Sequence, residues 1–133
     1  DNTDFSASCD ASMGSIGPYQ EVSFGVTYYN SKDSALGQIL LSIRREAGVK
    51  KYEISDDVFL KAITSTGRKQ VSYNWDFNTF YNLKIVRIAD TCSFYINNTF
   101  LEKSLINDVK YSYLRITVKA YESTAKLDNV QFE

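Results

Sequence analysis

Apolar and polar residues alternate at every second position through much of this chain, and this pattern constrains the fold more than any other feature. In residues 19–28, for example, Val22, Phe24, Val26 and Tyr28 fall on one side of an extended chain. A period of two is typical of a half-buried β-strand, because successive side chains point to opposite faces. Residues 38–45, 81–88, 92–97 and 111–121 alternate in the same way. The chain is therefore expected to fold into β-strands.

Short polar segments separate these runs and predict turns. They are Asn30–Ser34, Ala47-Gly48, Asp56-Asp57, Ala89–Thr91 and Asn97-Asn98. Further short strands are expected at 50–55, 58–63, 69–73, 99–103 and 126–132. Propensity alone would allow a helix over 34–46, but the tight hairpin that follows and the strand-rich context favour a strand. Ten or eleven short strands with polar turns predict an all-β sandwich or barrel.

The length of 133 residues suits one domain, so we expect a single β-sandwich over 1–133. Apolar residues make up 44% of the chain, which is enough for a hydrophobic core. The chain begins at Asp1 without a methionine. We therefore expect a processed protein or a domain excised from a larger, secreted or cell-surface protein, with other domains of that parent as partners.

Composition also argues against several classes of function. The net charge is −1 with mixed signs throughout, which does not suit a nucleic-acid binder. No apolar run reaches the roughly 20 residues of a transmembrane segment. Histidine is absent, which excludes catalytic triads and most zinc sites. The chain is therefore expected to have no catalytic machinery of its own.

Cys9 and Cys92 are the only cysteines. They are too few for a thiolate metal cluster, so they form either one disulfide or two buried thiols. A disulfide would close most of the chain into a loop and stabilise it by about 4–5 kcal/mol. Both alternatives remain open from the sequence.

The C-terminal half resembles the concanavalin A-like lectin and laminin-G-like jelly-roll superfamily. The segments that carry the resemblance are Tyr81–Arg87 (YNLKIVR), Phe94–Asn98 (FYINN), Leu114–Ala120 (LRITVKA) and Ala125–Phe132 (AKLDNVQF). Asn98 stands where the family usually has glycine, but asparagine also tolerates a left-handed turn. The resemblance implies an antiparallel two-sheet jelly-roll sandwich. Its motifs specify turns and core positions, so they indicate a fold better than a function.

Some members of this superfamily are glucan-cleaving enzymes, which carry carboxylates in the pattern E-x-D-x-x-E on one strand. The nearest match here runs from Glu53 to Asp56-Asp57, and its spacing differs. We therefore expect a non-catalytic module. Several members also bind a structural calcium through an aspartate in the last strand, which corresponds here to Asp128. The alternative is that Asp128 only accepts hydrogen bonds at a strand edge.

Trp75, the only tryptophan, lies among polar neighbours in a segment expected at a loop or strand edge. Sugars stack their C–H faces on exposed aromatic rings, and nearby polar side chains bind their hydroxyls. Trp75 with Tyr73, Asn74 and Asp76 supplies that chemistry. The candidate ligand-binding set adds a second aromatic platform, Tyr28 and Tyr29. The alternative is that the Trp75 ring caps the core with its N–H bonded to backbone.

These observations predict a secreted, non-catalytic carbohydrate-binding module whose partner is a glycan or polysaccharide. The alternative is a structural or adhesion domain of the same fold that binds another protein. Aligned exposed aromatics would favour the first function, and a large apolar patch the second. Asn97-Asn98-Thr99 also forms an N-glycosylation sequon in a predicted turn.

Overall fold

The computed structural model describes residues 4–15, 19–29, 35–58, 65–105, 113–121 and 123–133. Ten strands are formed: β1 (Phe5–Ser15), β2 (Gln20–Tyr29), β3 (Ala35–Glu46), β4 (Val49–Val58), β5 (Ser65–Ser72), β6 (Tyr81–Ile88), β7 (Thr91–Ile96), β8 (Thr99–Leu105), β9 (Tyr113–Tyr121) and β10 (Ser123–Phe132). The described residues contain no helix that is long and apolar enough to cross a membrane. The predicted all-β class is confirmed.

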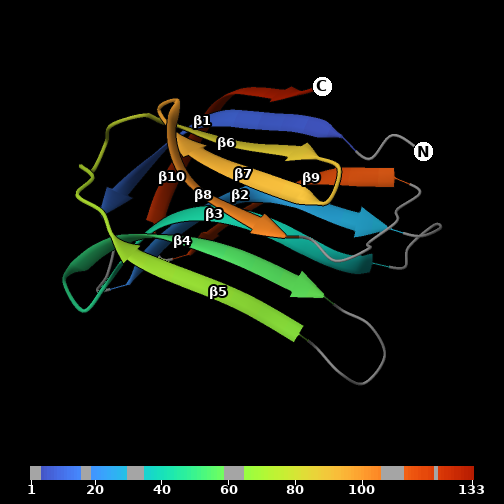
Figure 1. Cartoon of the computed structure of the whole chain (residues 1–133). Coiled ribbons are helices and arrows are strands. Elements are labelled where there is room, and N and C mark those ends of the chain that lie inside the picture. The colour runs from blue at the N-terminus through green and yellow to red at the C-terminus, as the bar shows by residue number, and fades with distance from the viewer. Residues whose placement is uncertain (1–3, 16–18, 30–34, 59–64, 106–112, 122) are drawn as a thin grey trace.

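The strands form two antiparallel sheets that stack as a sandwich (Figure 1). Sheet A has the strand order β10-β1-β6-β7-β8, and sheet B has the order β5-β4-β3-β2-β9. Neighbours in the sheets are often distant in sequence, because β1 pairs with β6 and β10, and β2 pairs with β9. Such long-range antiparallel pairing gives the jelly-roll sandwich that the sequence predicted.

The core lies between the sheets and follows the alternation of the sequence. Phe24 on β2 pairs with Leu41 on β3 and Val118 on β9, and all three side chains share the inward face of sheet B. Leu83 and Phe94 belong to the inward face of sheet A and are fully buried. The residues that alternate with these on each strand therefore face outward, and a surface site on either sheet must be formed by them.

Several turns form where the sequence predicts them. Asn97 and Asn98 have φ values of 50° and 62°, and Ala47 and Gly48 have values of 51° and 77°. Two consecutive left-handed residues are what a tight hairpin needs to match the twist of its strands. The turn predicted at Asp56-Asp57 is wrong, because β4 continues to Val58. The turn predicted at 30–34 and most of the strand predicted at 58–63 lie outside the described residues.

Of the two alternatives for the cysteines, the Cys9–Cys92 disulfide is wrong, because both residues are buried free thiols. Cys9 pairs with Leu83 on β6, which pairs with Ile96 on β7, four residues from Cys92. Two strand spacings and four residues along β7 put the two Cα atoms about 16 Å apart. A disulfide requires roughly 7 Å or less. Burial raises the pKa of each thiol to about 12, so both stay protonated near neutral pH.

One side of the sandwich leaves part of its core uncovered. This side is formed by the edge strands β9 and β10, which lie next to each other at the margins of the two sheets. Their apolar side chains are between 36% and 50% exposed, namely Ile116, Val118, Leu127, Val130 and Phe132. The core is therefore closed less completely here than at its centre.

Candidate functional site

Trp75 is a core residue. Its side chain has an exposed fraction of 0%, its Nε1–H donates to the backbone oxygen of Arg44 at 3.2 Å, and Phe77 packs edge-on against its ring. The structure thus selects the second alternative from the sequence. A ring without exposed area offers no face to a sugar, so the prediction of an exposed Trp75 platform is wrong.

The other predicted site residues do not converge on one place. Tyr28 is a buried core residue, whereas Tyr29 is on the opposite face of β2, beneath the guanidinium of Arg115. Tyr73 packs partly into the core against Tyr52. The segment after β5 that contains it is bonded to the start of β4, because the backbone N–H of Tyr73 donates to the backbone oxygen of Lys50. Tyr29 pairs with Ala35 at the other end of sheet B, so Tyr29 is far from the segment that contains Tyr73.

Asn74 and Asp76 are exposed. The backbone N–H of Asp76 donates to the Tyr81 hydroxyl at 2.8 Å. Asn74 borders a shallow hollow beside the β3–β4 turn, together with Val49, Lys50 and Tyr73. These residues form a polar surface, but without an exposed tryptophan they lack the stacking platform that the prediction required.

A different surface concentrates the unusual chemistry of this chain: the outward face of sheet B. Polar side chains from three neighbouring strands point outward there and are nevertheless buried or nearly so. We call these residues the polar face: Glu21, Ser23, Thr27, Gln38, Ser42, Arg44, Glu53, Ser55 and Asp57. Their position follows from register, because Ser23 pairs with Ser42 and Ser42 pairs with Glu53. Ser23 and Ser42 share a hydrogen bond of 2.7 Å between their hydroxyls.

Arg44 is the centre of the polar face. Its Nη1 lies 2.8 Å from Glu53 Oε2 and 3.6 Å from Glu21 Oε1, and its Nη2 donates to Glu46 at 2.5 Å. The guanidinium also lies over the ring of Tyr19, at 5.1 Å from the centroid. Burial lowers the pKa of Arg44, but the charges of Glu53 and its other neighbours outweigh burial and hold it above the ordinary value.

β5 extends the polar face toward solvent. Gln70 donates to Glu53 Oε1 at 2.8 Å, and Arg68 lies 3.7 Å from Glu53 and 3.9 Å from Asp57. Glu53 is almost fully buried, whereas the Arg68 side chain is 53% exposed. Carboxylates therefore form the lower layer, and a guanidinium lies above them in contact with water.

Two buried polar atoms of this face have no hydrogen-bond partner among the described residues. They are Nε of Arg44 and Oδ1 of Asp57; the other Asp57 oxygen accepts from Gln38 Nε2 at 3.3 Å. Buried polar atoms are usually hydrogen-bonded, so such exceptions need an explanation.

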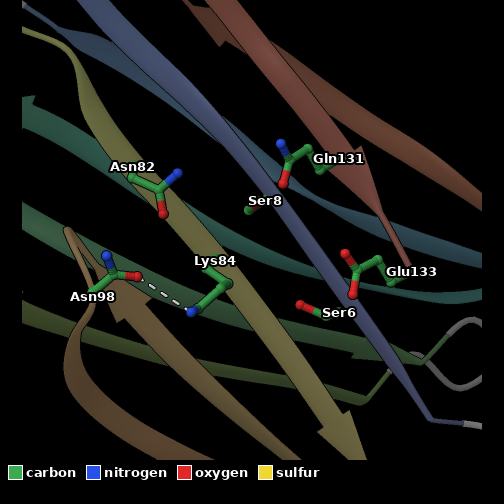
Figure 2. Close-up of a pocket in the computed structure, with 7 residues that line it drawn as sticks. All are labelled: Ser6, Ser8, Asn82, Lys84, Asn98, Gln131 and Glu133. Carbon is green, nitrogen blue, oxygen red and sulfur yellow. Dashed lines mark hydrogen bonds between the residues drawn. The ribbon is translucent and has the colours of Figure 1, made fainter.

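The outward face of sheet A carries a second polar surface, a shallow groove of about 300 Å³ (Figure 2). Side chains of β1, β6, β10 and the β7–β8 turn line it: Ser6, Ser8, Asn82, Lys84, Asn98, Gln131 and Glu133. Lys84 Nζ donates to Asn98 Oδ1 at 3.3 Å and lies over the Tyr95 ring. Unlike the polar face, this groove has no buried ion pair among its lining residues, so it resembles an ordinary solvated sheet surface.

The acidic residues considered for catalysis and for calcium lie in different places. Glu53 and Asp57 share the polar face, whereas Asp56 faces inward. Exposed Asp128 accepts a hydrogen bond from the backbone N–H of Asn129 and pairs with Asp10 on β1. Asp10 in turn binds Asn129 and Asn82, and these bonds lower its pKa. The described residues contain no cluster of three potential metal ligands among His, Cys, Asp and Glu. Calcium at Asp128 stays a prediction.

Comparison with known proteins finds no matching family model and no matching curated protein. Solved structures do match. Carbohydrate-binding module CBM66 from Bacillus subtilis is 18% identical, with a TM-score of 0.63 over 98% of this chain and 74% of that chain. Sheep galectin-11 is 8% identical, with a TM-score of 0.69 over 98% and 90%.

The PL7 alginate lyase AlyA1 from Zobellia galactanivorans is 12% identical, with a TM-score of 0.60. It matches all of this chain, which spans 62% of the length of the lyase chain. At these identities the matches establish the fold alone. The chain has a lectin-like jelly-roll sandwich fold, and this is the fold that its C-terminal segments predicted.

Proposed function

We propose that this domain binds a glycan or polysaccharide without modifying it, and that the polar face of sheet B is its binding surface. The buried ion-pair network around Arg44 and Glu53 is the observation that carries the proposal. Burying charges costs several kcal/mol of desolvation per ion, and a well-packed apolar pair is often no less stable. A network of this kind outside the core is therefore better explained by a ligand than by stability.

The chemistry of the polar face suits sugar hydroxyls. Hydroxyl groups donate and accept, so fixed carboxylate, guanidinium and amide groups recognise them together. Arg68 and Gln70 are exposed, and Glu53 beneath them holds both in place. The carbohydrate-binding module described above shares the fold, and its name agrees with a sugar ligand.

The non-catalytic part of the proposal rests on how the carboxylates are used. Both oxygens of Glu53 are engaged, one by Arg44 and the other by Gln70. The neighbouring Asp56, which the sequence grouped with it, is on the other side of the sheet. Glycosidic cleavage needs two carboxyl groups that flank the scissile bond. Glu53 is instead positioned as an organiser of the surface.

A glycan array followed by affinity measurements tests this function. We expect binding with a dissociation constant roughly between micromolar and millimolar. Arg68→Gln should weaken binding about tenfold or more, because it removes charge-assisted hydrogen bonds. Lys84→Gln in the sheet A groove is the matched control and should bind like the parent. The proposal fails if no array glycan binds, or if Arg68→Gln binds as tightly as the parent.

Binding to another protein is the second candidate function, and the open side between β9 and β10 favours it. Val130 and Phe132 are 50% and 47% exposed there, although Ala7, which pairs with Phe132 on β1, is buried. Exposed apolar residues grouped along two edge strands are typical of contact surfaces. Light scattering after gel filtration will detect self-association, and Val118→Lys should abolish any dimer that this side forms. The secreted or cell-surface location, like the larger parent protein, stays a prediction.

A further inference from the structure

We propose that the glycan bound by the polar face is anionic, carrying carboxylate or sulfate groups. This inference rests on the proposed function and names the ligand class of the same site. It comes from the way burial sorts the charges on the outward face of sheet B. The carboxylates of Glu53 and Asp57 are at most 9% exposed, whereas the Arg68 side chain is 53% exposed. A ligand that approaches from solvent therefore meets the cation first.

Register places further cations at the opposite margin of the same face. Arg115 and Lys119 on β9 pair with Thr27 and Ser23, so both point outward from sheet B, and both are exposed. Thr117 between them bonds the Thr27 hydroxyl at 2.5 Å. Arg115 also stacks over Tyr29, at 4.8 Å from the ring centroid. The β9 margin thus holds two outward-facing cations.

The register row through Arg68 carries no other charge, and the neighbouring rows through Arg115 and Lys119 reach only the buried carboxylates of Asp57 and Glu53. Thr117 pairs with Gly25, Gly25 with Leu40, Leu40 with Ser55, and Ser55 with Arg68. Four strand spacings separate β5 from β9, which is about 19 Å. A ligand that contacts both margins must therefore be an extended chain with negative charges on more than one unit. An acidic oligosaccharide fits that description.

The exposed carboxylate of this face, Glu46, does not cancel the excess of cations. Glu46 is 50% exposed, but it lies at the end of β3 beside the β3–β4 turn and pairs with Arg44. Among the described residues, the outward face holds the cations Arg44, Lys51, Arg68, Arg115 and Lys119 and the carboxylates Glu21, Glu46, Glu53 and Asp57. Five positive and four negative charges leave an excess of one. The chain as a whole carries −1, so this attraction is local rather than general.

Guanidinium groups bind carboxylates and sulfates through paired N–H donors. The ion pairs with Glu53 and Asp57 would hold the guanidinium group of Arg68 in one orientation. The lower carboxylates would then position the cation, and the ligand anion would bind from the other side. This arrangement also explains why the acidic residues are buried under the basic one.

Acidic tetrasaccharides and their carboxyl-reduced counterparts test the inference. The probes are tetragalacturonate, an alginate tetrasaccharide and a chondroitin sulfate tetrasaccharide, titrated into the parent by calorimetry. At least one acidic probe should bind, and its affinity should fall as salt rises. Its neutral form, which is carboxyl-reduced and for chondroitin sulfate also desulfated, should bind at least about tenfold more weakly, and so should the acidic probe with Arg68→Gln. Lys84→Gln should leave its affinity unchanged.

Two controls separate the possible failures. Poly-glutamate of similar charge should not displace the acidic tetrasaccharide. If it competes as well as the sugar itself, binding reflects only unspecific charge attraction, and the inference is overturned. A second outcome is that neutral glycans bind the outward face of sheet B as tightly as acidic ones, or that only neutral glycans bind there. That outcome would contradict an anionic ligand but would leave the proposed glycan-binding function standing. If neither acidic nor neutral glycans bind, the proposed function itself falls, and this inference with it.

Discussion

Trp75 shows how a single residue can look functional in the sequence and structural in the fold. Its neighbours Asn74 and Asp76 are polar and exposed, but its own ring is enclosed by the end of the core. Three contacts hold it there: the N–H bond to Arg44 O, the edge of Phe77, and Lys50 Nζ above the ring at 5.2 Å. The backbone bond to Arg44 links this core residue to the strand that carries the centre of the polar face.

We predict that Trp75→Ala destabilises the domain by about 3–5 kcal/mol, because it removes a large buried ring and leaves a cavity. Denaturant unfolding of parent and variant measures the change. Phe80→Ala is the matched control, since Phe80 is an aromatic residue of the same segment that is 49% exposed, and it should cost far less. A Trp75→Ala variant as stable as the parent would contradict the core assignment.

Asp56 is a second residue whose environment makes a prediction. Burial, reinforced by the neighbouring charge of Asp57, raises the pKa of this half-buried carboxyl. A group with a raised folded-state pKa contributes its stability below the unfolded pKa, about 3.9, and loses it as pH rises through the folded value. The charged form therefore destabilises the native state near neutral pH.

Asp56→Asn should accordingly raise the melting temperature at pH 7 and leave it nearly unchanged at pH 3. Melting curves across this pH range, recorded for parent and variant together, check the prediction. Asp128→Asn is a suitable comparison, because Asp128 is exposed at the surface of β10. A variant that is less stable than the parent at pH 7 would show that the Asp56 charge has a stabilising partner.

At the scale of single elements, the close approach of β2 and β3 depends on Gly25. A Cβ atom at this position would lie 1.8 Å from the backbone oxygen of Ile39 and 2.9 Å from the Cα of Leu40. Backbone atoms of a central strand cannot move aside without breaking the ladder. Gly25 also lies in the middle of the outward face of sheet B, so the spacing of the strands there depends on it.

Gly25→Ala should destabilise the domain by about 1–3 kcal/mol or more through this overlap. Thermal unfolding of Gly25→Ala and Gly48→Ala, each compared with the parent, separates the effect of atomic overlap from the effect of backbone strain. A Cβ atom at Gly48 would have no other atom within 4 Å, but the φ of 77° there makes alanine cost about 1–2 kcal/mol. If Gly25→Ala loses no more stability than Gly48→Ala, then β2 and β3 lie less close together than the Cβ distances indicate.

The alternation in the sequence predicted β2, β3, β6, β7 and β9, because large apolar residues mark their inward faces. It missed β1, where small residues occupy most of that face: Ala7, Cys9, Ala11 and Met13 are buried opposite outward serines. The missing strand also explains the wrong disulfide. Without β1 in register with β6, nothing in the sequence shows that Cys9 and Cys92 lie at different levels of the sheet.

The polar face could not be recognised from the sequence for a related reason. Glu21, Arg44 and Glu53 each occupy the polar positions of an alternating strand, where solvated side chains are the usual occupants. Only the pairing of β2 with β3 and of β3 with β4 brings them together, and only burial distinguishes a network from a solvated surface. The spacing of Glu53 and Asp57 on one strand is the available signal, but the adjacent polar residues Asp56-Asp57 predict a turn instead.

For the whole molecule, the inward and outward faces of the two sheets have different roles. The two sheets stack face to face (Figure 1), and their inward faces supply the core. The outward face of sheet B carries the buried charges and exposed cations proposed to bind a glycan. The groove on sheet A lies on the opposite side of the sandwich, which makes it a competing surface that one experiment can distinguish (Figure 2).

Amide chemical-shift mapping by NMR, with the strongest array glycan added to saturation, tests the central claim most directly. We expect the largest shifts on β3, β4 and β5, around Arg44, Glu53 and Arg68, with smaller changes on β9. Shifts concentrated around Lys84 and Asn98 would place the site in the sheet A groove. Shifts confined to 73–76 would return it to the loop after β5, and either result would contradict the assignment of the polar face.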